Sequence, residues 1–318
     1  MASELDRAVA AVVRDCLGVR SGEEALVICN PATERLGVAL RDEAARAGAD
    51  AVLTVMGERE SHAAEPPAPV AAAMKAADAV MAPTVQSLSH TAARREASES
   101  GTRIATLPGV TEEMLARVMS ADMEGLRRKG KAVAEVLDSA SEARITCPNG
   151  SDLRLGLEGR EAIPDAGELT APGAFGNLPC GEGFIAPLEG TSEGTLVVDG
   201  SIAGIGRVSE AVTLTVSRGH LTDATGADGA RLMELLTAHG EDGTNVAELG
   251  IGTNEKAQLT GEILEDEKLL GTCHVAFGAS AAIGGTVQVP VHLDCVVLRP
   301  TITAGGTELV ADGNLLVT

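Results

Sequence analysis

The sequence predicts an α/β amino-terminal domain with a parallel sheet over residues 1–140, followed by a mixed, β-rich α+β domain over residues 141–318. In the first region, apolar runs of strand length alternate with helical patterns, as in parallel strands joined by crossover helices. From about Ser141, glycine becomes frequent and short alternating segments dominate. A chain of 318 residues with 44% hydrophobic content can form two cores.

The first region contains an ordered series of helices and strands. The expected helices are Glu4–Leu17, Thr33–Ala47, Val70–Ala77 and, as the connection out of the domain, about Ala121–Ser139; the expected strands are Ala25–Cys29, Ala51–Val55, Ala79–Ala82 and Arg103–Leu107. The turn after the first strand, residues 29–33, lacks the glycines that a pyrophosphate-binding turn requires. We therefore expect this domain to be a scaffold or a dimerisation domain.

The second region is expected to form mostly strands. The expected strands are Ala143–Cys147, Leu153–Leu157, Thr195–Val198, Ala211–Val216 and Val287–Leu298. One helix is expected at Ala227–Ala238, because Leu232, Leu235 and Leu236 share a face at helical spacing. This pattern predicts a β-rich domain with one or two helices.

The composition excludes several classes of function. A formal net charge of −21 repels nucleic-acid phosphates and anionic lipid, so neither nucleic acid nor a membrane surface is an expected partner. The acidic start has no signal-peptide pattern, and the six scattered cysteines include no Cys-x-x-Cys pair. We expect a cytoplasmic protein with reduced thiols that acts on a small molecule or a small peptide.

The strand around His292 and Asp294 carries two polar side chains in an apolar setting. Residues two apart on a strand point to the same face, so the imidazole and the carboxylate lie side by side. The pair could simply form a hydrogen bond with itself, or it could bind a metal. His274 favours the metal, because it lies in a second apolar segment that follows the acidic group 265–267.

Two more glutamates lie in surroundings too apolar and too rich in glycine for ordinary solvated acids. Glu248 is flanked by apolar residues and glycines, and Glu182 lies in an apolar, glycine-rich loop. One zinc ion needs about three protein ligands and an open position. A larger set of carboxylates and imidazoles suits two metals about 3.5–4 Å apart. We therefore predict a metal centre, with two divalent ions per chain as the expected content.

Four ordered motifs carry a family resemblance: NLPCGEGFIAP, AELGIGTN, LEDEKLLGTCHVAFG and VHLD. Together they resemble the thermophilic metallo-aminopeptidases of the aminopeptidase T and aminopeptidase S type. The resemblance implies a homodimeric hydrolase that uses zinc, cobalt or manganese and a metal-activated water to remove amino-terminal residues from peptides. By motif, it implies six metal ligands: Glu182, Glu248, Glu267, His274, His292 and Asp294. Glu248, as the bridging group, and Glu182 are the expected catalytic carboxylates.

The chain departs from that family at two points. It has no tyrosine, although the family places a catalytic tyrosine shortly after the first histidine ligand. The interval from Glu267 to His274 is two residues longer than the family leads us to expect, so Glu265 is a second possible ligand. Without the tyrosine, Lys268 or a hydroxyl such as that of Thr272 would have to polarise the carbonyl.

Two other interpretations fit the same residues. Ring-cleaving dihydroxypyridine dioxygenases resemble this family in the second half, and they would use one Fe(II) held by His274, His292 and Asp294. A metal-binding oligomer without activity is the third. Glu182 and Glu248 favour the hydrolase, because a mononuclear iron site does not require them, whereas the absent tyrosine favours the dioxygenase.

Overall fold

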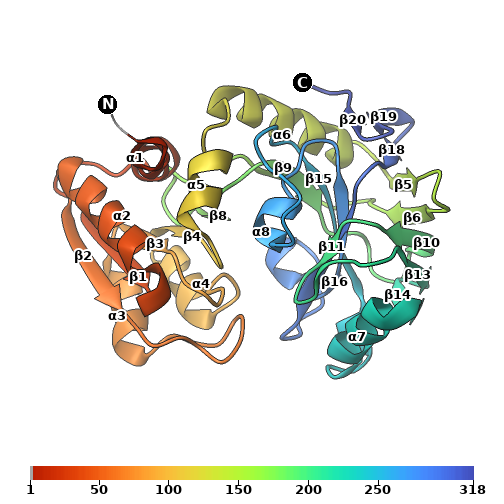
Figure 1. Cartoon of the computed structure of the whole chain (residues 1–318), viewed down its shortest axis with the longest axis horizontal. Coiled ribbons are helices and arrows are strands. Elements are labelled where there is room, and N and C mark those ends of the chain that lie inside the picture. Colours follow the sequence, from red (N-terminus) through yellow and green to blue (C-terminus); the bar gives the residue numbers. More distant parts are fainter. Residues whose placement is uncertain (1–2) are drawn as a thin grey trace. The chain divides into compact units, whose positions relative to one another are not determined.

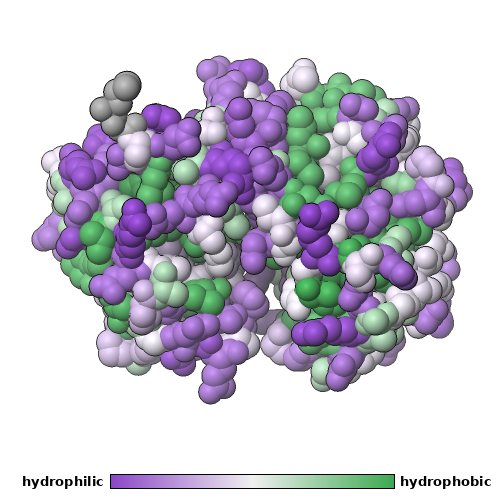
Figure 2. Space-filling model, in the orientation of Figure 1, coloured by the Kyte–Doolittle hydropathy of each residue, from purple (hydrophilic) through white to green (hydrophobic). Residues whose placement is uncertain are grey.

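The computed structural model describes residues 3–318, which form two compact units: the described residues up to 123 with 167–180, and residues 124–166 with 181–318. Within the described part of the chain, no helix is long and apolar enough to cross a membrane. On the face drawn in Figure 2, hydrophilic residues are spread over both units and interspersed with apolar ones.

The first unit is built on a parallel sheet of order β2-β1-β3-β4-β8 (Figure 1). Its strands are β1 (Glu24–Cys29), β2 (Asp50–Val55), β3 (Ala79–Ala82), β4 (Arg103–Thr106) and β8 (Phe175–Asn177). Its helices are α1 (Glu4–Ala10), which continues as a π-helical turn over Ala11–Cys16, α2 (Glu34–Arg46), α3 (Ala68–Ala76), α4 (Ala92–Glu99) and α5 (Glu112–Val118), with a 3-10 turn at Pro31–Thr33. Apolar side chains of β1, β3 and β4, among them Ile28, Val80 and Ile104, form its core with Met74 of α3.

The second unit contains two antiparallel sheets. The eight-stranded sheet has the order β14-β13-β10-β6-β5-β18-β19-β20, and the seven-stranded sheet has the order β12-β11-β17-β16-β15-β9-β7. The first comprises β5 (Glu142–Thr146), β6 (Asp152–Gly156), β10 (Glu193–Val198), β13 (Val212–Ser217), β14 (His220–Ala224), β18 (Thr301–Ala304), β19 (Thr307–Ala311) and β20 (Asn314–Leu315). The second comprises β7 (Ile163–Asp165), β9 (Glu182–Ile185), β11 (Ser201–Ile202), β12 (Gly206–Arg207), β15 (Val246–Gly252), β16 (Cys273–Gly278) and β17 (His292–Val297).

A single apolar cluster joins these two sheets. Leu155 and Leu214 of the eight-stranded sheet pack in one core with Leu249 and Val275 of the seven-stranded sheet. Helices α6 (Met123–Asp138) and α7 (Gly226–Thr237) contribute to the same core. The short helix α8 (Ile263–Asp266) and 3-10 turns at Glu241–Thr244 and Ala281–Ile283 complete the unit. The seven-stranded sheet therefore has one face buried in this core, and its opposite face lies outside the core.

The predicted fold class is confirmed, because one parallel sheet with helices precedes two β-rich antiparallel sheets. The units differ from the expected boundary at residue 140 in two places. The first ends at Met123, and the chain returns to it at 167–180, where β8 extends the parallel sheet. The strand expected from Val287 begins only at His292, since Pro290 lacks the N–H that a strand ladder needs.

Candidate metal centre

The face of the seven-stranded sheet that points away from the core carries the predicted ligands. On β15, β16 and β17, Leu249, Val275 and Cys295 point into the core. Because side chains alternate along a strand, Glu248, His274 and Asp294 point to the other face. His292, two residues before Asp294, and Glu182 on β9 share that face by the same alternation. Four adjacent strands thus bring the polar groups together.

Small residues stand opposite these groups in the sheet. Gly250 pairs with His274, Gly252 pairs with Glu182, and Ala276 pairs with both Glu248 and Asp294. At Gly250 the space is already taken: a Cβ there would lie 2.1 Å from both Cε1 and Nε2 of the His274 imidazole. Glycine at 250 is therefore a requirement of the centre, because the imidazole lies across the space that a side chain would fill.

The two imidazoles meet around one carboxylate. Nε2 of His274 lies 3.3 Å from Oε1 of Glu248, and Nε2 of His292 lies 3.3 Å from Oε2 of the same residue. Nε2 of His292 also lies 3.5 Å from Oδ1 of Asp294, and Nε2 of His274 lies 3.1 Å from Oε2 of Glu182. Nδ1 of His292 lies 2.7 Å from the carbonyl oxygen of Ala279. A donor bond from Nδ1 to that oxygen leaves Nε2 as the free electron-pair donor.

A buried lysine completes the cluster on its other side. The side chain of Lys268 is 1% exposed, and its Nζ contacts Oε1 of Glu182, lies 2.7 Å from Oε1 of Glu267, and lies 3.5 Å from Oδ2 of Asp165. Lys268 directly follows Glu267, the residue that caps the carboxyl end of α8. Asp165 ends β7, which pairs with β9 beside Glu182.

The pKa values of the centre reflect burial opposed by neighbouring charge. Burial would lower the pKa of His274 and of His292, yet the nearby carboxylates raise both well above the ordinary value. Burial would raise the pKa of Glu248, yet hydrogen bonds from the two imidazoles lower it, and His292 similarly lowers the pKa of Asp294. Burial raises the pKa of Glu267 to about 8 and that of Asp165 to about 7, although Lys268 opposes both shifts. The imidazole positions therefore attract positive charge, whether a proton or a metal ion carries it.

These residues fit a divalent metal ion. Three groups each offer ligand atoms within 4.8 Å of one another: Glu182, Glu248 and His274; Glu248, His292 and Asp294; and Glu267, His274 and Asp294. Within residues 3–318, Oε2 of Glu182 and Nδ1 of His274 are buried atoms without a hydrogen-bond partner. Imidazole nitrogen and carboxylate oxygen are ligands that zinc, iron and manganese all accept. The fold thus supplies metal-binding groups, and their chemistry is compatible with several metals.

All six predicted ligands lie in this cluster. Glu265 lies outside these three groups, and its carboxylate accepts a hydrogen bond from the backbone N–H of Gln258. Sequence reasoning missed Asp165 and the part that Gly250 plays, and it considered Lys268 only as a substitute for the tyrosine. For Lys268 a signal existed, because a lysine next to the ligand-bearing acidic run is a natural counter-ion. Asp165 gave no signal, since its neighbourhood is an ordinary loop sequence.

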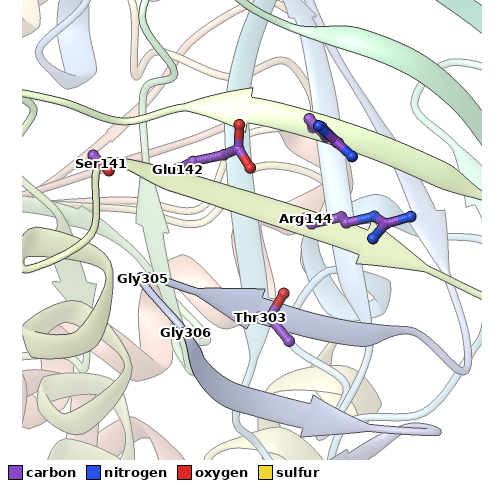
Figure 3. A pocket seen from close by; sticks show the side chains of 7 residues that line it. Ser141, Glu142, Arg144, Thr303, Gly305 and Gly306 are labelled. Atoms are coloured by element: carbon purple, nitrogen blue, oxygen red, sulfur yellow. The ribbon is translucent and has the colours of Figure 1, made fainter.

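A separate hollow lies on the eight-stranded sheet (Figure 3). It has a volume of about 260 Å³ and is lined by Ser141, Glu142, Arg144, Arg154, Thr303, Gly305 and Gly306. The guanidinium of Arg144 is bound by both carboxylate oxygens of Asp152, each at 2.7 Å. None of these lining residues belongs to the metal cluster, so the chemistry of the second unit is concentrated on the seven-stranded sheet.

Comparison with known proteins identifies the family. The family model described as 2,5-dihydroxypyridine 5,6-dioxygenase (NicX) matches residues 5–317. A 2,5-dihydroxypyridine 5,6-dioxygenase of Pseudomonas putida KT2440 is 26% identical over 241 residues, which cover 70% of this chain and 66% of that relative, just under two thirds of its length.

Two solved structures share the fold. The 2,5-dihydroxypyridine dioxygenase from Pseudomonas putida KT2440 superposes with a TM-score of 0.88 at 21% identity, over 100% of this chain and 99% of that one. Wild-type AmpT from Thermus thermophilus superposes with a TM-score of 0.73 at 20% identity, over 99% of each chain. At these identities the two likenesses show the fold alone.

The predicted aminopeptidase activity is wrong, and with it the description of the chain as a metalloprotease or hydrolase. The match to the dioxygenase family over residues 5–317 and the curated relative overturn it. The motifs misled because the chain shares its fold with AmpT, and a shared fold does not fix the reaction. The missing tyrosine was the observation that pointed away from a peptidase. With a family model matched from residue 5 to residue 317, this chain belongs to the 2,5-dihydroxypyridine 5,6-dioxygenase (NicX) family of enzymes.

Proposed function

We propose that this chain is a ring-cleaving dioxygenase that acts on 2,5-dihydroxypyridine or a close analogue and uses one Fe(II) ion. The observation that carries the proposal is the combination of the family match over residues 5–317 with the placement of His274, His292 and Asp294 on one face of the sheet, where each belongs to overlapping groups that could hold a metal. Two histidines and one carboxylate are the ligand set typical of Fe(II) oxygenases. In the reaction, the C5–C6 bond breaks and both atoms of one O₂ enter the ring-opened product, so no other reductant is consumed.

His274, His292 and Asp294 would hold the metal in this proposal. When bound, the ion supplies the redox chemistry that lets dioxygen react with an aromatic ring. The hydrogen bond between Nδ1 of His292 and the carbonyl oxygen of Ala279, at 2.7 Å, fixes the orientation of that imidazole. Gly250 leaves room for the ring of His274, because a Cβ at this position would lie 2.1 Å from two of its ring atoms.

Glu248 is the residue to which we assign proton transfer. Its two oxygens lie 3.3 Å from Nε2 of the two imidazoles, which places this carboxylate beside the metal position. An ionised, buried carboxylate beside the metal position can accept the proton that a substrate hydroxyl releases when the ring is activated. The centre is enclosed as well, since Glu182, Glu248 and His274 are all less than 8% exposed, and this limits competing access of water.

The experiment is oxygen uptake by protein that has been loaded with Fe(II) under anaerobic conditions. With 2,5-dihydroxypyridine, we expect one O₂ consumed per ring and, with labelled oxygen, both labels in the product. Glu248→Gln is expected to retain its iron and to lose turnover by about 10²-fold or more, because it removes the proton acceptor. An iron-loaded wild-type protein that consumes no oxygen with any dihydroxypyridine would overturn the proposal.

Assembly as a homodimer stays a prediction. Light scattering during size-exclusion chromatography measures it directly, and we expect twice the mass of one chain.

A further inference from the structure

Lys268 is a charged residue of the second unit that is only 1% exposed. Its ammonium group meets three carboxylates from three different elements: Asp165 at the end of β7, Glu182 at the start of β9, and Glu267 after α8. An ammonium has three N–H donors: Nζ donates hydrogen bonds to Glu182 and Glu267, and it faces Asp165 at ion-pair distance. A buried lysine so fully surrounded by acids is costly to place without a purpose.

The lysine uses the carboxylates that a second metal ion would need. Two of the three metal-binding groups contain Glu182 or Glu267, and each of these residues has one oxygen in contact with Nζ of Lys268. The third group, Glu248 with His292 and Asp294, has no member in contact with the lysine. Lys268 therefore occupies Glu182 and Glu267, and it contacts neither histidine nor Asp294, the residues proposed to hold the metal.

A second divalent ion at Glu182 and Glu267 would lie beside a positive charge that is already in place. Repulsion between the two is strong in a buried site, where little water screens it. The ion would also have to share His274 with the first metal, because Oε1 of Glu182 and Oε1 of Glu267 already bind Nζ.

We propose that Lys268 is a built-in cation that takes the place of a second metal ion, so that the centre binds one divalent ion per chain. In this role Lys268 is a positioning residue: it holds Glu182 and Glu267 and leaves the histidines to a single metal. The inference rests on the proposed function, because it concerns the same centre, and it explains why carboxylates beyond the two-histidine, one-carboxylate set are present in a mononuclear enzyme.

The test is a metal count with Zn²⁺ as the probe, since zinc needs no protection from oxygen. Metal-free wild type, Lys268→Met and Lys268→Arg are saturated with Zn²⁺, freed of excess by gel filtration, and measured by elemental analysis and by calorimetric titration. We expect one ion per chain in wild type and in Lys268→Arg, which keeps the charge. Lys268→Met should bind two, because methionine has similar length but no charge and frees both glutamates.

Lys129→Met is the matched control. Lys129 also forms an ion pair, with Nζ 2.9 Å from Oε2 of Glu255, but its side chain is 23% exposed and touches no member of the metal groups. The Lys129→Met variant should still bind one zinc ion per chain. If Lys268→Met does not give folded protein by circular dichroism, the double variant Lys268→Met with Asp165→Asn replaces it, because it removes one negative charge together with the positive one. That double variant should also bind two ions.

Two ions in wild type would overturn the inference at once, and so would a single ion in the folded lysine-to-methionine variants. The count is independent of turnover. A wild type with one ion and no oxygen uptake would therefore overturn the proposed function and leave the role of Lys268 standing. A folded Lys268→Met variant that still binds one ion would contradict the proposed role of Lys268, whatever its activity.

Discussion

Two clusters of buried polar side chains in this molecule differ in how their polar groups find partners. At the carboxyl end of the parallel sheet, Ser89, Thr106 and Asn177 bind one another: the two hydroxyls lie 2.9 Å apart, and Oδ1 of Asn177 accepts from both, at 2.9 and 2.6 Å. That cluster is neutral and its members satisfy each other. The centre on the seven-stranded sheet instead gathers several carboxylates around two imidazoles and leaves a buried oxygen of Glu182 without a hydrogen bond.

The comparison shows which kind of burial indicates a site. The carboxyl edge of a parallel sheet is the usual ligand site of α/β folds, yet here its side chains form neutral hydrogen bonds among themselves. Buried charge is different, because it costs several kcal/mol per ion unless a partner of opposite sign is present. The charged centre therefore needs a cation, and the neutral cluster does not.

The largest effect on the charged centre is expected when a histidine is removed. His292→Ala takes one nitrogen from the centre, and we expect metal affinity to fall by at least about 100-fold, since loss of even an outer partner costs 10–100-fold. His239→Ala is the control, because His239 is exposed. Calorimetric titration with Zn²⁺ measures both. Equal affinities in wild type and His292→Ala would place the metal elsewhere.

Gly250→Ala tests the geometry and leaves the ligands themselves in place. Its Cβ would lie 2.1 Å from two atoms of the His274 ring, so the ring must move. We expect metal affinity to fall by about 10–100-fold, and the free energy of unfolding to fall by about 1–3 kcal/mol. Gly57→Ala is the matched control, because no atom lies within 4 Å of its added Cβ. An unchanged affinity in Gly250→Ala would show that the ring position does not matter.

The pH dependence should differ between the metal-free and metal-bound protein. Burial and charge raise the pKa of Glu267 to about 8 and of Asp165 to about 7, and the acids raise those of His274 and His292. The folded protein thus holds more protons than the unfolded chain from about pH 4 to above 8, and its stability falls as pH rises through that window.

Metal binding displaces the protons of His274 and His292, so metal affinity should rise with pH, by up to about tenfold per pH unit for each proton released. The lowered pKa values of Glu248 and Asp294 act only in acid, below their ordinary range. Zn²⁺ titrations at pH 6, 7 and 8, with thermal unfolding of the metal-free protein at the same values, measure both trends. A metal affinity independent of pH would contradict the raised histidine pKa values.

The smallest effect on metal binding is expected from a change in the neutral cluster. Thr106→Val removes a hydroxyl that is fully buried and bonded to Ser89 and Asn177, and it should cost about 1–3 kcal/mol of unfolding free energy. Metal affinity should not change. Chemical denaturation and Zn²⁺ titration of the same preparation measure both quantities, and a loss of metal affinity would show that the two clusters are not independent.

Local patterns predicted part of the site well. Alternation along one strand is enough to place His292 and Asp294 on one face, and apolar surroundings single out His274, Glu182 and Glu248. The register that joins β9, β15, β16 and β17 is a non-local property, so neither the pairing of Gly250 with His274 nor the approach of Asp165 to Lys268 can be inferred from sequence spacing.

Function was harder to predict than fold because chains of one fold can carry different reactions, and this chain superposes on both a dioxygenase and AmpT. Two features outside the six predicted ligands bear on the function. A tyrosine is absent from the chain, and a buried lysine stands among the carboxylates that suggested two metals. If Lys268 takes the place of a second ion as proposed, the number of carboxylates in the sequence overestimates the metal content.

The central claim is that His274, His292 and Asp294 hold a single divalent ion. Anomalous diffraction from crystals of the zinc-loaded protein, recorded on both sides of the zinc absorption edge, tests it most directly. We predict one anomalous peak per chain, about 2.0–2.2 Å from Nε2 of each histidine and from a carboxylate oxygen of Asp294. A peak between Glu182 and Glu267, a second peak of equal height, or no peak beside the histidines would contradict it.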